Sequence, residues 1–214
     1  RAWSRRALAF AATAQVRSNS SSTFAMLAVQ ADNGVAVNKK ITTTSGVLHL
    51  NGDADSNTAD DDTDTVAFAG ALTMSSSAAL TLSAKTGSLT AAGALTLLAK
   101  NGISIQDTFT STTSGSKPLY INADTDGNGG TLTVQTGKTV TSNNNHLYIT
   151  AYDIDLDGSI TTGTAGTKIH GSVDETIGVG AVSTKNMHVE QWELQRITSS
   201  GLTVGSSVSG SITV

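Results

Sequence analysis

Short apolar-polar-apolar triplets recur along this chain with a period of about 23 residues, as in repeat architectures. Leu72 and Leu95 are separated by the same interval as Leu80 and Ile103. Successive side chains of a strand point to opposite faces, so each triplet is the unit of a half-buried strand. A fixed period of this length, built from strands and turns, is typical of a solenoid. The four triplets are Leu72-Thr73-Met74, Leu80-Thr81-Leu82, Leu95-Thr96-Leu97 and Ile103-Ser104-Ile105.

The same rhythm extends to both sides of this stretch. Leu132 and Ile154 are one such interval apart, and so are Leu147 and Ile169, which predicts that each pair stacks. The sequence therefore predicts an all-β parallel β-helix with about three short strands per coil of roughly 22–24 residues. The Thr- and Ser-rich segment 107–117 is expected to be a connection, and 189–197 to contain one short helical turn with Trp192 as its apolar plug.

Composition agrees with a narrow core. Only 14% of the residues are charged and 4% are aromatic, and there is a single Pro. A globular domain normally has about a quarter charged residues and fills a wide core with rings. A β-helix has a thin core that Leu, Ile and Val fill, and Pro would remove a hydrogen bond from its ladders.

Charge and hydropathy exclude some classes of partner. The formal charge of −4 argues against nucleic acid or an anionic membrane face. No apolar run approaches the roughly 18 residues that span a bilayer, so no membrane span is expected. The chain has no Cys, which excludes disulfides and thiolate metal sites.

The chain divides into an atypical opening segment and a repeat segment. Residues 1–31 are rich in Arg, Ala and Ser, and we expect an ordered first coil there; the alternative is an organellar transit peptide. Residues 32–214 form the repeat segment, with acidic loops at 51–64 and 122–130. Matching residues of the two loops are separated by about the length of three coils, which predicts that both loops emerge from one edge of the tube.

The acidic loops are the candidate calcium sites. Closely spaced oxygen ligands followed by Gly resemble the opening of a calcium loop. The match is partial, because Gln135 occupies the twelfth position counted from Asp124, where Glu is usual, and Thr58 replaces the Gly in the loop at 51–64. The alternative is a solvated turn, since Asp, Asn and Gly are ordinary turn residues. The predicted ligands are Asp124, Asp126 and Asn128 in one loop, and Asp53, Asp55 and Asn57 in the other.

Two further functions rest on alternating polar residues. Asp153, Asp155 and Asp157 should face outward from one strand, as the acids of a carbohydrate-active β-helix would. Such an enzyme also needs a cationic group, and the repeat register predicts no Arg or His nearby, so we expect no enzyme. The third possibility is an ice-binding solenoid, because Thr73 stacks on Thr96 and Thr81 on Ser104.

Several motifs resemble a known class of repeat. The segments 176–180, 193–198 and 201–205, with Leu119–Asp126 and Leu147–Gly158, resemble filamentous-haemagglutinin-like arrays of giant surface adhesins and algal extracellular repeat proteins. The resemblance covers roughly residues 33–214. It implies a right-handed β-helix, extracellular or at the cell surface, that serves as a structural or adhesive filament segment. The triplet at 212–214 lacks a polar cap, which predicts end-to-end self-association, and surface glycans are a further expected partner.

Overall fold

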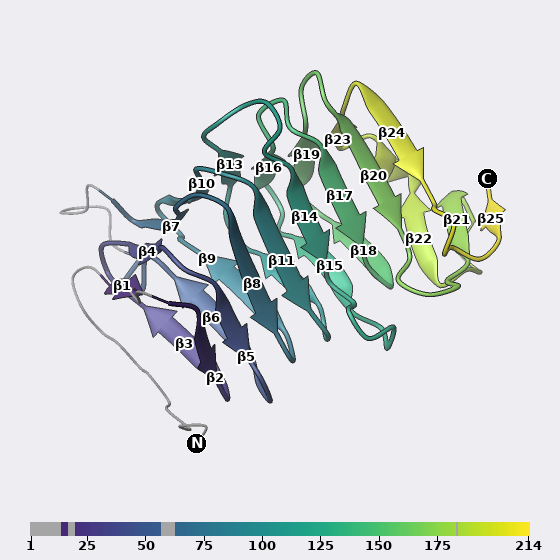
Figure 1. Ribbon diagram of the computed structural model, residues 1–214. Helices are drawn as coiled ribbons and strands as arrows, with labels where there is room; N and C mark the ends of the chain where they lie inside the picture. The colour runs from purple at the N-terminus through teal and green to yellow at the C-terminus, as the bar shows by residue number, and fades with distance from the viewer. Residues whose placement is uncertain (1–13, 17–19, 57–62, 183) are drawn as a thin grey trace.

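The structure, a computed structural model, describes residues 14–16, 20–56, 63–182 and 184–214. Within these residues the chain winds into a parallel β-helix with three strands per coil, which confirms the predicted fold class. In Figure 1 strands such as β8 and β11 run down the near face. The chain returns upward behind them as it advances from left to right, so the coil is right-handed.

Three parallel sheets run along the axis, and we name them A, B and C in the order in which the chain visits them. Sheet A contains β1 (Ala14–Val16), β4 (Val35–Val37), β7 (Thr65–Phe68), β10 (Ser88–Ala91), β13 (Phe109–Ser111), β16 (Thr139–Thr141), β19 (Ser159–Thr161) and β23 (Ile197–Thr198). Sheet B contains β2 (Ser22–Phe24), β5 (Ile41–Thr43), β8 (Leu72–Ser76), β11 (Leu95–Ala99), β14 (Leu119–Asn122), β17 (Leu147–Thr150), β20 (Gly166–His170) and β24 (Gly201–Val204). Sheet C contains β3 (Leu27–Gln30), β6 (Leu48–Asn51), β9 (Leu80–Ser83), β12 (Ile103–Ile105), β15 (Thr131–Val134) and β18 (Asp153–Leu156).

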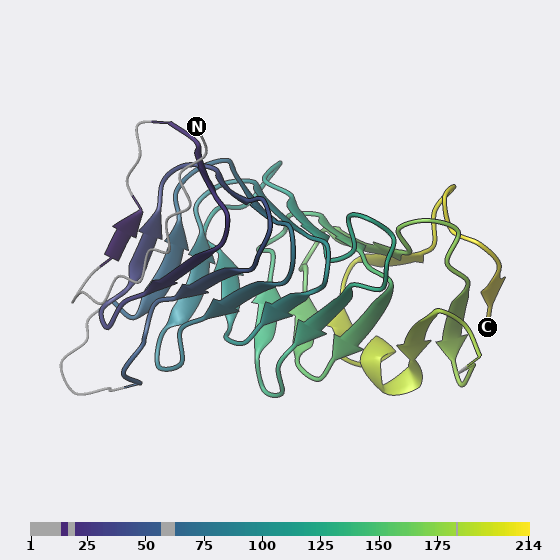
Figure 2. The same ribbon diagram turned by 90° about the horizontal axis from the view of Figure 1, so that it is seen from below.

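A smaller cap sheet lies at the C-terminal end of the coil (Figure 2). It contains β21 (Ile177–Gly180), β22 (Met187–Glu190) and β25 (Ile212–Thr213), and β22 is followed along the chain by the helix α1 (Gln191–Leu194). The helical turn expected at 189–197 is therefore present. Trp192, however, is 38% exposed, and Glu193 is the residue of α1 that turns inward. The prediction that Trp192 fills the inside of the turn as its apolar plug is wrong. Its ring lies on the outer side of the turn, where Arg196 Cζ is 4.6 Å from the ring centroid.

The core is a set of aliphatic columns that run from coil to coil. In sheet C one column joins residues that pair in register and are at most 6% exposed, namely Leu27, Leu48, Leu80, Ile103, Leu132 and Ile154. Each strand supplies two such positions, separated by one outward side chain, as the apolar-polar-apolar triplets predict. Burial of this continuous apolar stack stabilises the tube, because each coil covers the core of its neighbour.

Strand register confirms the central repeat and corrects its later part. Leu72 pairs with Leu95 and Leu80 with Ile103, as the sequence period predicts. Leu147 pairs with Thr167 rather than Ile169, so this coil is shorter than the predicted one. The prediction assumed that every inward position is apolar, whereas Thr167 is buried and donates its hydroxyl to Thr162 at 3.4 Å.

The segment 107–117 was predicted as a connection, but it contains β13. Phe109 is fully buried and pairs with Leu89 on one side and Val140 on the other. Thr110 in β13 and Thr108 just before it are both partly exposed, so the buried ring of Phe109 lies between two outward Thr residues. The abundance of Thr and Ser concealed it, although Thr is a good strand residue.

The two acidic loops lie at different corners of the tube. The loop at 51–64 connects β6 to β7, between sheets C and A, and the loop at 122–130 connects β14 to β15, between sheets B and C. The prediction of a shared edge is therefore wrong. The coil between the paired Leu48 and Leu80 contains the first loop and is longer than the central coils, so the offset between the two loops is not a whole number of coils.

Candidate functional site

A polar groove follows the corner between sheets C and A. It has a volume of about 420 Å³ and is lined by residues of successive turns, among them Asp53, Lys85, Asp107, Gln135 and Lys138. Each of these residues follows a strand of sheet C, so the coil repeat places them in a row. Carboxylates, ammonium groups and amides alternate along the groove, which gives it donors and acceptors for a polar ligand.

Two charged residues of the groove are almost fully buried: Asp107 is 3% exposed and Asp53 is 2% exposed. Asp107 Oδ2 accepts a hydrogen bond from the backbone N–H of Ala84 at 2.7 Å, and its Oδ1 accepts one from Lys138 Nζ at 2.5 Å. Ala84, Asp107 and Lys138 belong to three successive coils. This carboxylate therefore ties three coils together, and its charge is balanced by the ammonium group.

Asp53 has a similar role at the N-terminal end of the groove. Its Oδ1 accepts from the backbone N–H of Ser56 at 2.7 Å, and its Oδ2 accepts from the backbone N–H and the hydroxyl of Thr86 at 2.6 and 2.8 Å. The Thr86 hydroxyl also lies 2.7 Å from Asp64 Oδ2. Two carboxylates of one acidic loop thus hold the turn of the next coil.

The other acidic loop repeats this local geometry. Asp124 is fully buried, and its Oδ1 accepts from the backbone N–H groups of Asn128 at 2.9 Å and Gly129 at 3.2 Å. Its Oδ2 accepts from Ser172 Oγ at 2.5 Å. The backbone N–H of Asp124 bonds Asn122 Oδ1 at 3.0 Å, just as that of Asp53 bonds Asn51 Oδ1 at 3.0 Å.

These contacts bear on the predicted calcium ligands. Asp126 is exposed, and its Oδ2 lies 3.8 Å from Lys100 Nζ. Asn128 donates its side-chain amide to the backbone carbonyl of Asp126 at 3.2 Å. Asp55 is exposed in the turn after Asp53, and Asn57 lies outside the described residues. Among the described residues, no group of three or more acidic or His side chains is placed to hold a metal.

The residues of the loop at 122–130 fit a turn better than a calcium site. Both carboxylate oxygens of Asp124 are already used by N–H and O–H donors, whereas calcium needs about six to eight oxygen ligands directed at one point. An ion at Asp124 would have to share a carboxylate that already accepts hydrogen bonds from Asn128, Gly129 and Ser172. Calcium binding at these loops stays a prediction from the sequence.

The alternating acids of β18 face outward, with Ile154 and Leu156 buried between them, as predicted. Asp153 Oδ1 accepts from the backbone N–H of His188 at 2.8 Å. Burial raises the pKa of Asp153, and the hydrogen bonds from backbone N–H groups oppose that rise. The expectation that no cation lies nearby is wrong, because Arg196 Nη1 is 3.7 Å from Asp157 Oδ1. Arg196 comes from a segment outside the regular repeat, so spacing did not reveal it.

Glu193 closes the end of sheet C beside these acids. It is 1% exposed, and its Oε1 accepts from the backbone N–H of Leu156 at 2.9 Å while Oε2 accepts from that of Glu190 at 2.9 Å. Burial raises the pKa of Glu193 to about 7, although the two backbone N–H groups act in the opposite direction. The group terminates the ladder of sheet C, because it satisfies a backbone donor of β18.

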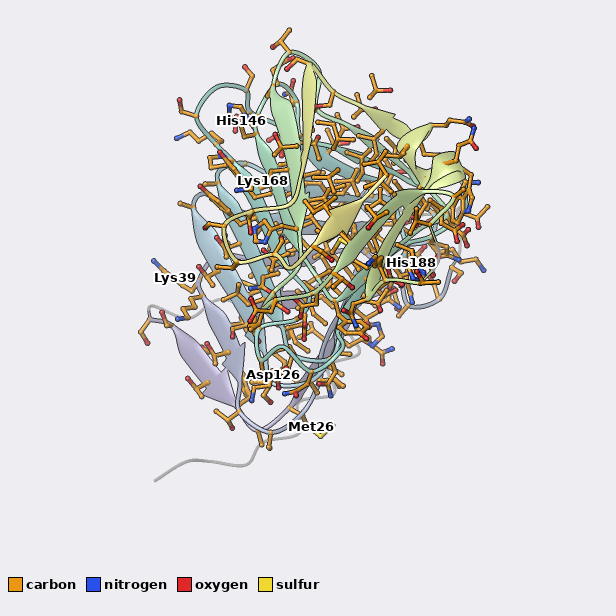
Figure 3. All side chains as sticks on the ribbon, turned by 90° about the vertical axis from the view of Figure 1, so that its right-hand side faces the viewer. Met26, Lys39, Asp126, His146, Lys168 and His188 are labelled. Carbon is orange, nitrogen blue, oxygen red and sulfur yellow. The ribbon has the colours of Figure 1, made fainter. Side chains whose placement is uncertain are left out.

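The Thr columns suggested for ice binding are interrupted. Thr73 does pair with Thr96 on sheet B, but the same column continues to Tyr120 and Tyr148, whose rings stack at 4.8 Å with an interplanar angle of 11°. Figure 3 shows Lys168, the next residue of this column, on the same outer face as His146. On sheet C the column of Thr81 and Ser104 reaches Thr133 and then Asp155. In both columns the row of hydroxyl groups is therefore interrupted.

Comparison with protein-family models, with curated proteins and with solved structures finds no match for this chain. The resemblance to adhesin repeats therefore stays a prediction from the motifs. Among the described residues, no helix is long and apolar enough to cross a membrane. The fold is established by the strand pairing, and function has to be argued from the surfaces of the tube.

Sequence reasoning missed two features of these surfaces. Lys85, Asp107 and Lys138 share the groove, yet the interval between the first two is shorter than the interval between the last two, so no repeat reveals them. The other feature is the outer face of sheet A, where Thr108-Phe109-Thr110 and Thr139-Val140-Thr141 repeat one pattern. That pattern of Thr, apolar residue and Thr was a usable signal for both the strand β13 and its face.

Proposed function

We propose that this chain is a structural segment of an extracellular surface filament or adhesin and that it acts as a stiff spacer. The observation that carries the proposal is the continuity of the three ladders. In the part of the chain that the structure describes, sheets A and B each contain eight parallel strands in one unbroken order, and sheet C contains six. Backbone hydrogen bonds along the axis and the aliphatic columns inside resist bending together, because the coils as far as β18 are joined to their neighbours through three sheets and the later coils through sheets A and B.

The corners add to this axial stiffness. Asp53, Asp107 and Asp124 each bond groups of other coils, so the buried charges of the corners serve as ties between coils. The motifs resembling adhesin arrays support the same function and an extracellular location. A spacer needs no catalytic site, and a low share of charged residues, 14%, suits a surface built of Thr, Ser and Asn.

End-to-end association is part of the proposal. β24 pairs with β20 on one side, and among the described residues no strand pairs with its other side. Leu202 in β24 is 39% exposed. An exposed edge of this kind, beside the cap sheet, is a template for a parallel strand of another chain, and a head-to-tail contact that does not close makes a fibre.

Glycan binding is the second candidate function, and the groove at the corner between sheets C and A favours it. Its volume of about 420 Å³ and its mixture of amides, carboxylates and ammonium groups suit a polar, hydroxyl-rich ligand. Parallel titrations of the wild-type chain and a Lys85→Ala variant with oligosaccharides test it. Affinity that is the same for both proteins would contradict binding in the groove.

Sedimentation velocity at increasing protein concentration tests the filament proposal. We expect species that are multiples of the monomer, and we expect Leu202→Lys to reduce them, since a Lys on an edge strand opposes pairing. Val47→Lys is the matched control, because Val47 is 38% exposed at the corner between β5 and β6, away from β24. Association that is unaffected by Leu202→Lys, or equally affected by both variants, would contradict stacking through β24.

A further inference from the structure

The outer face of sheet A carries two ranks of hydroxyl side chains. The rank after the buried position joins Thr90, Thr110, Thr141, Thr161 and Thr198, which pair in unbroken register from coil to coil. The rank before the buried position contains the residues Thr65, Ser88, Thr108, Thr139 and Ser159. The successive coils of β10, β13, β16 and β19 thus present a hydroxyl residue in both ranks, without a charged or aromatic side chain between them.

The hydroxyl groups on the outer face of sheet A and those at the corners of the tube differ in their hydrogen-bond partners. At the corners, hydroxyls bond the protein, as when Thr43 donates to the carbonyl of Gly46 and Thr162 to that of Ala165. On sheet A, the side chains of Thr90, Thr110 and Thr141 make no hydrogen bond with another described residue, and Thr139 and Ser159 bond each other at 2.8 Å. The face therefore offers its hydroxyl groups outward.

The geometry of the face is fixed by the fold. Adjacent parallel strands lie about 4.8 Å apart, and side chains on one face recur roughly every 6.6 Å along a strand. Thr is β-branched and stiff at χ1, so its hydroxyl and methyl groups hold their positions. The result is a two-dimensional array of hydroxyl groups, with methyl groups at the Thr positions, that repeats about every 4.8 Å across the strands and about every 6.6 Å along them. A regular array of this kind can order water with the periodicity that an ice surface requires.

We propose that this Thr/Ser face of sheet A binds ice. Ordered water anchored by the hydroxyls and confined between the methyl groups would join the crystal lattice, and binding costs little entropy because the side chains are already fixed. Because an ice surface is a periodic solid, it binds to a regular protein face rather than in a pocket. Sheets B and C do not offer this, since Tyr120 and Tyr148 break one column and Asp155 breaks another.

The test is inhibition of ice recrystallisation by the full chain, with fluorescently labelled protein applied to a growing ice crystal. The wild-type chain should keep ice grains small and should concentrate in the crystal. Thr110→Tyr places a ring in the middle of the face and should abolish both effects. Thr96→Tyr is the matched control, because Thr96 is an outward, partly exposed residue at the centre of sheet B.

Circular dichroism and thermal melting show whether each variant folds. Thr141→Lys, which also lies within the lattice, gives a second measurement should Thr110→Tyr be misfolded, and it too should lose activity. A wild-type chain without effect on ice overturns the proposal, as does equal activity of Thr110→Tyr and Thr96→Tyr. If the protein co-sediments with crystalline cellulose and has no effect on ice, the ice-binding proposal is overturned in favour of polysaccharide binding. The ice assay is independent of association through β24, so either proposal can fail alone.

Discussion

Lys138 Nζ lies 2.5 Å from Oδ1 of Asp107, and this ion pair joins two neighbouring coils at the corner between sheets C and A. The carboxylate is 4% exposed and the lysine side chain 30%. Because Asp107 also accepts the backbone N–H of Ala84, the pair is one end of a contact across three coils. The buried acid therefore depends on two donors from different turns.

Replacement of Asp107 by Ala should lower the free energy of unfolding by about 1–3 kcal/mol, because it leaves the N–H of Ala84 without an acceptor. Lys138→Met should cost at least as much, because it leaves the buried carboxylate of Asp107 without its cation. Urea denaturation of both variants measures the difference. A clearly smaller loss in Lys138→Met would show that the backbone contact with Ala84, rather than the ion pair, dominates.

Replacement of Asp124 by Ala should also destabilise the chain by about 1–3 kcal/mol, because the N–H groups of Asn128 and Gly129 lose their acceptor. Asp126→Ala is the control, since its ion pair with Lys100 is long and partly exposed, and pairs of this kind contribute about 0–1 kcal/mol. Chemical denaturation of the two variants compares them. Equal stability of both variants would contradict a structural role for the buried carboxylate.

The same loop gives a test of the calcium prediction. Since the oxygens of Asp124 are used by protein donors, the melting temperature of the wild-type chain should be the same in calcium and in chelator. A rise in calcium that Asp124→Ala abolishes would establish the metal site that the sequence motif suggests, and it would show that the loop rearranges around the ion.

Stability should depend on pH through Glu193. Its pKa in the folded chain, about 7, is above the ordinary value of 4.5, so the folded state holds a proton that the unfolded state has released between these pH values. Stability from this group is therefore complete below about pH 4.5 and is lost as pH rises through 7. The raised pKa of Asp153 acts in the same direction.

Glu193→Gln removes this titration, so the decrease in stability between pH 5 and pH 8 should be smaller than in the wild-type chain. The amide has one acceptor oxygen for two backbone donors, so the variant should also be less stable at pH 5. Thermal unfolding at several pH values measures both effects. A pH dependence identical to that of the wild-type chain would rule out Glu193 as its source.

Replacement of Gly102 by Ala tests how closely neighbouring coils are packed. The φ of Gly102 is +97°, and a Cβ added there would lie 2.9 Å from the backbone oxygen of Thr131 in the next coil. Gly102→Ala should therefore destabilise the chain by more than the roughly 1–2 kcal/mol that a left-handed conformation costs an L-residue. Gly115→Ala is the matched control, because its φ is +74° but no atom lies within 4 Å of the added Cβ. Similar losses would mean that the coils separate easily.

The sequence predicts the fold because inward positions are set by local alternation. Leu80, Leu82, Ile103 and Ile105 can be placed in the core from spacing alone, since the strand period fixes which side chains face inward. The strand register outside the central coils is harder to predict from the sequence. Thr167 fills an inward position with a hydroxyl, and the acidic loops change the length of their coils, so neither is visible in a constant period.

The candidate site is harder to predict because corners join residues by coil stacking rather than by spacing. Asp53 and Asp124 resemble metal ligands in the sequence, and their bonds to Thr86 and Ser172 depend on which turn lies beside them. Arg196 reaches Asp157 from outside the repeat. Trp192 and Glu193 show the same limit, since a single turn of helix can direct either side chain inward.

Electron microscopy of the purified chain over a range of concentrations tests the proposed filament segment most directly. We predict straight rods one coil in width that lengthen as concentration rises and that Leu202→Lys shortens, because coils stack along the axis. Isolated monomers at every concentration, or sheets and bundles formed by lateral contacts, would contradict a segment that extends end to end.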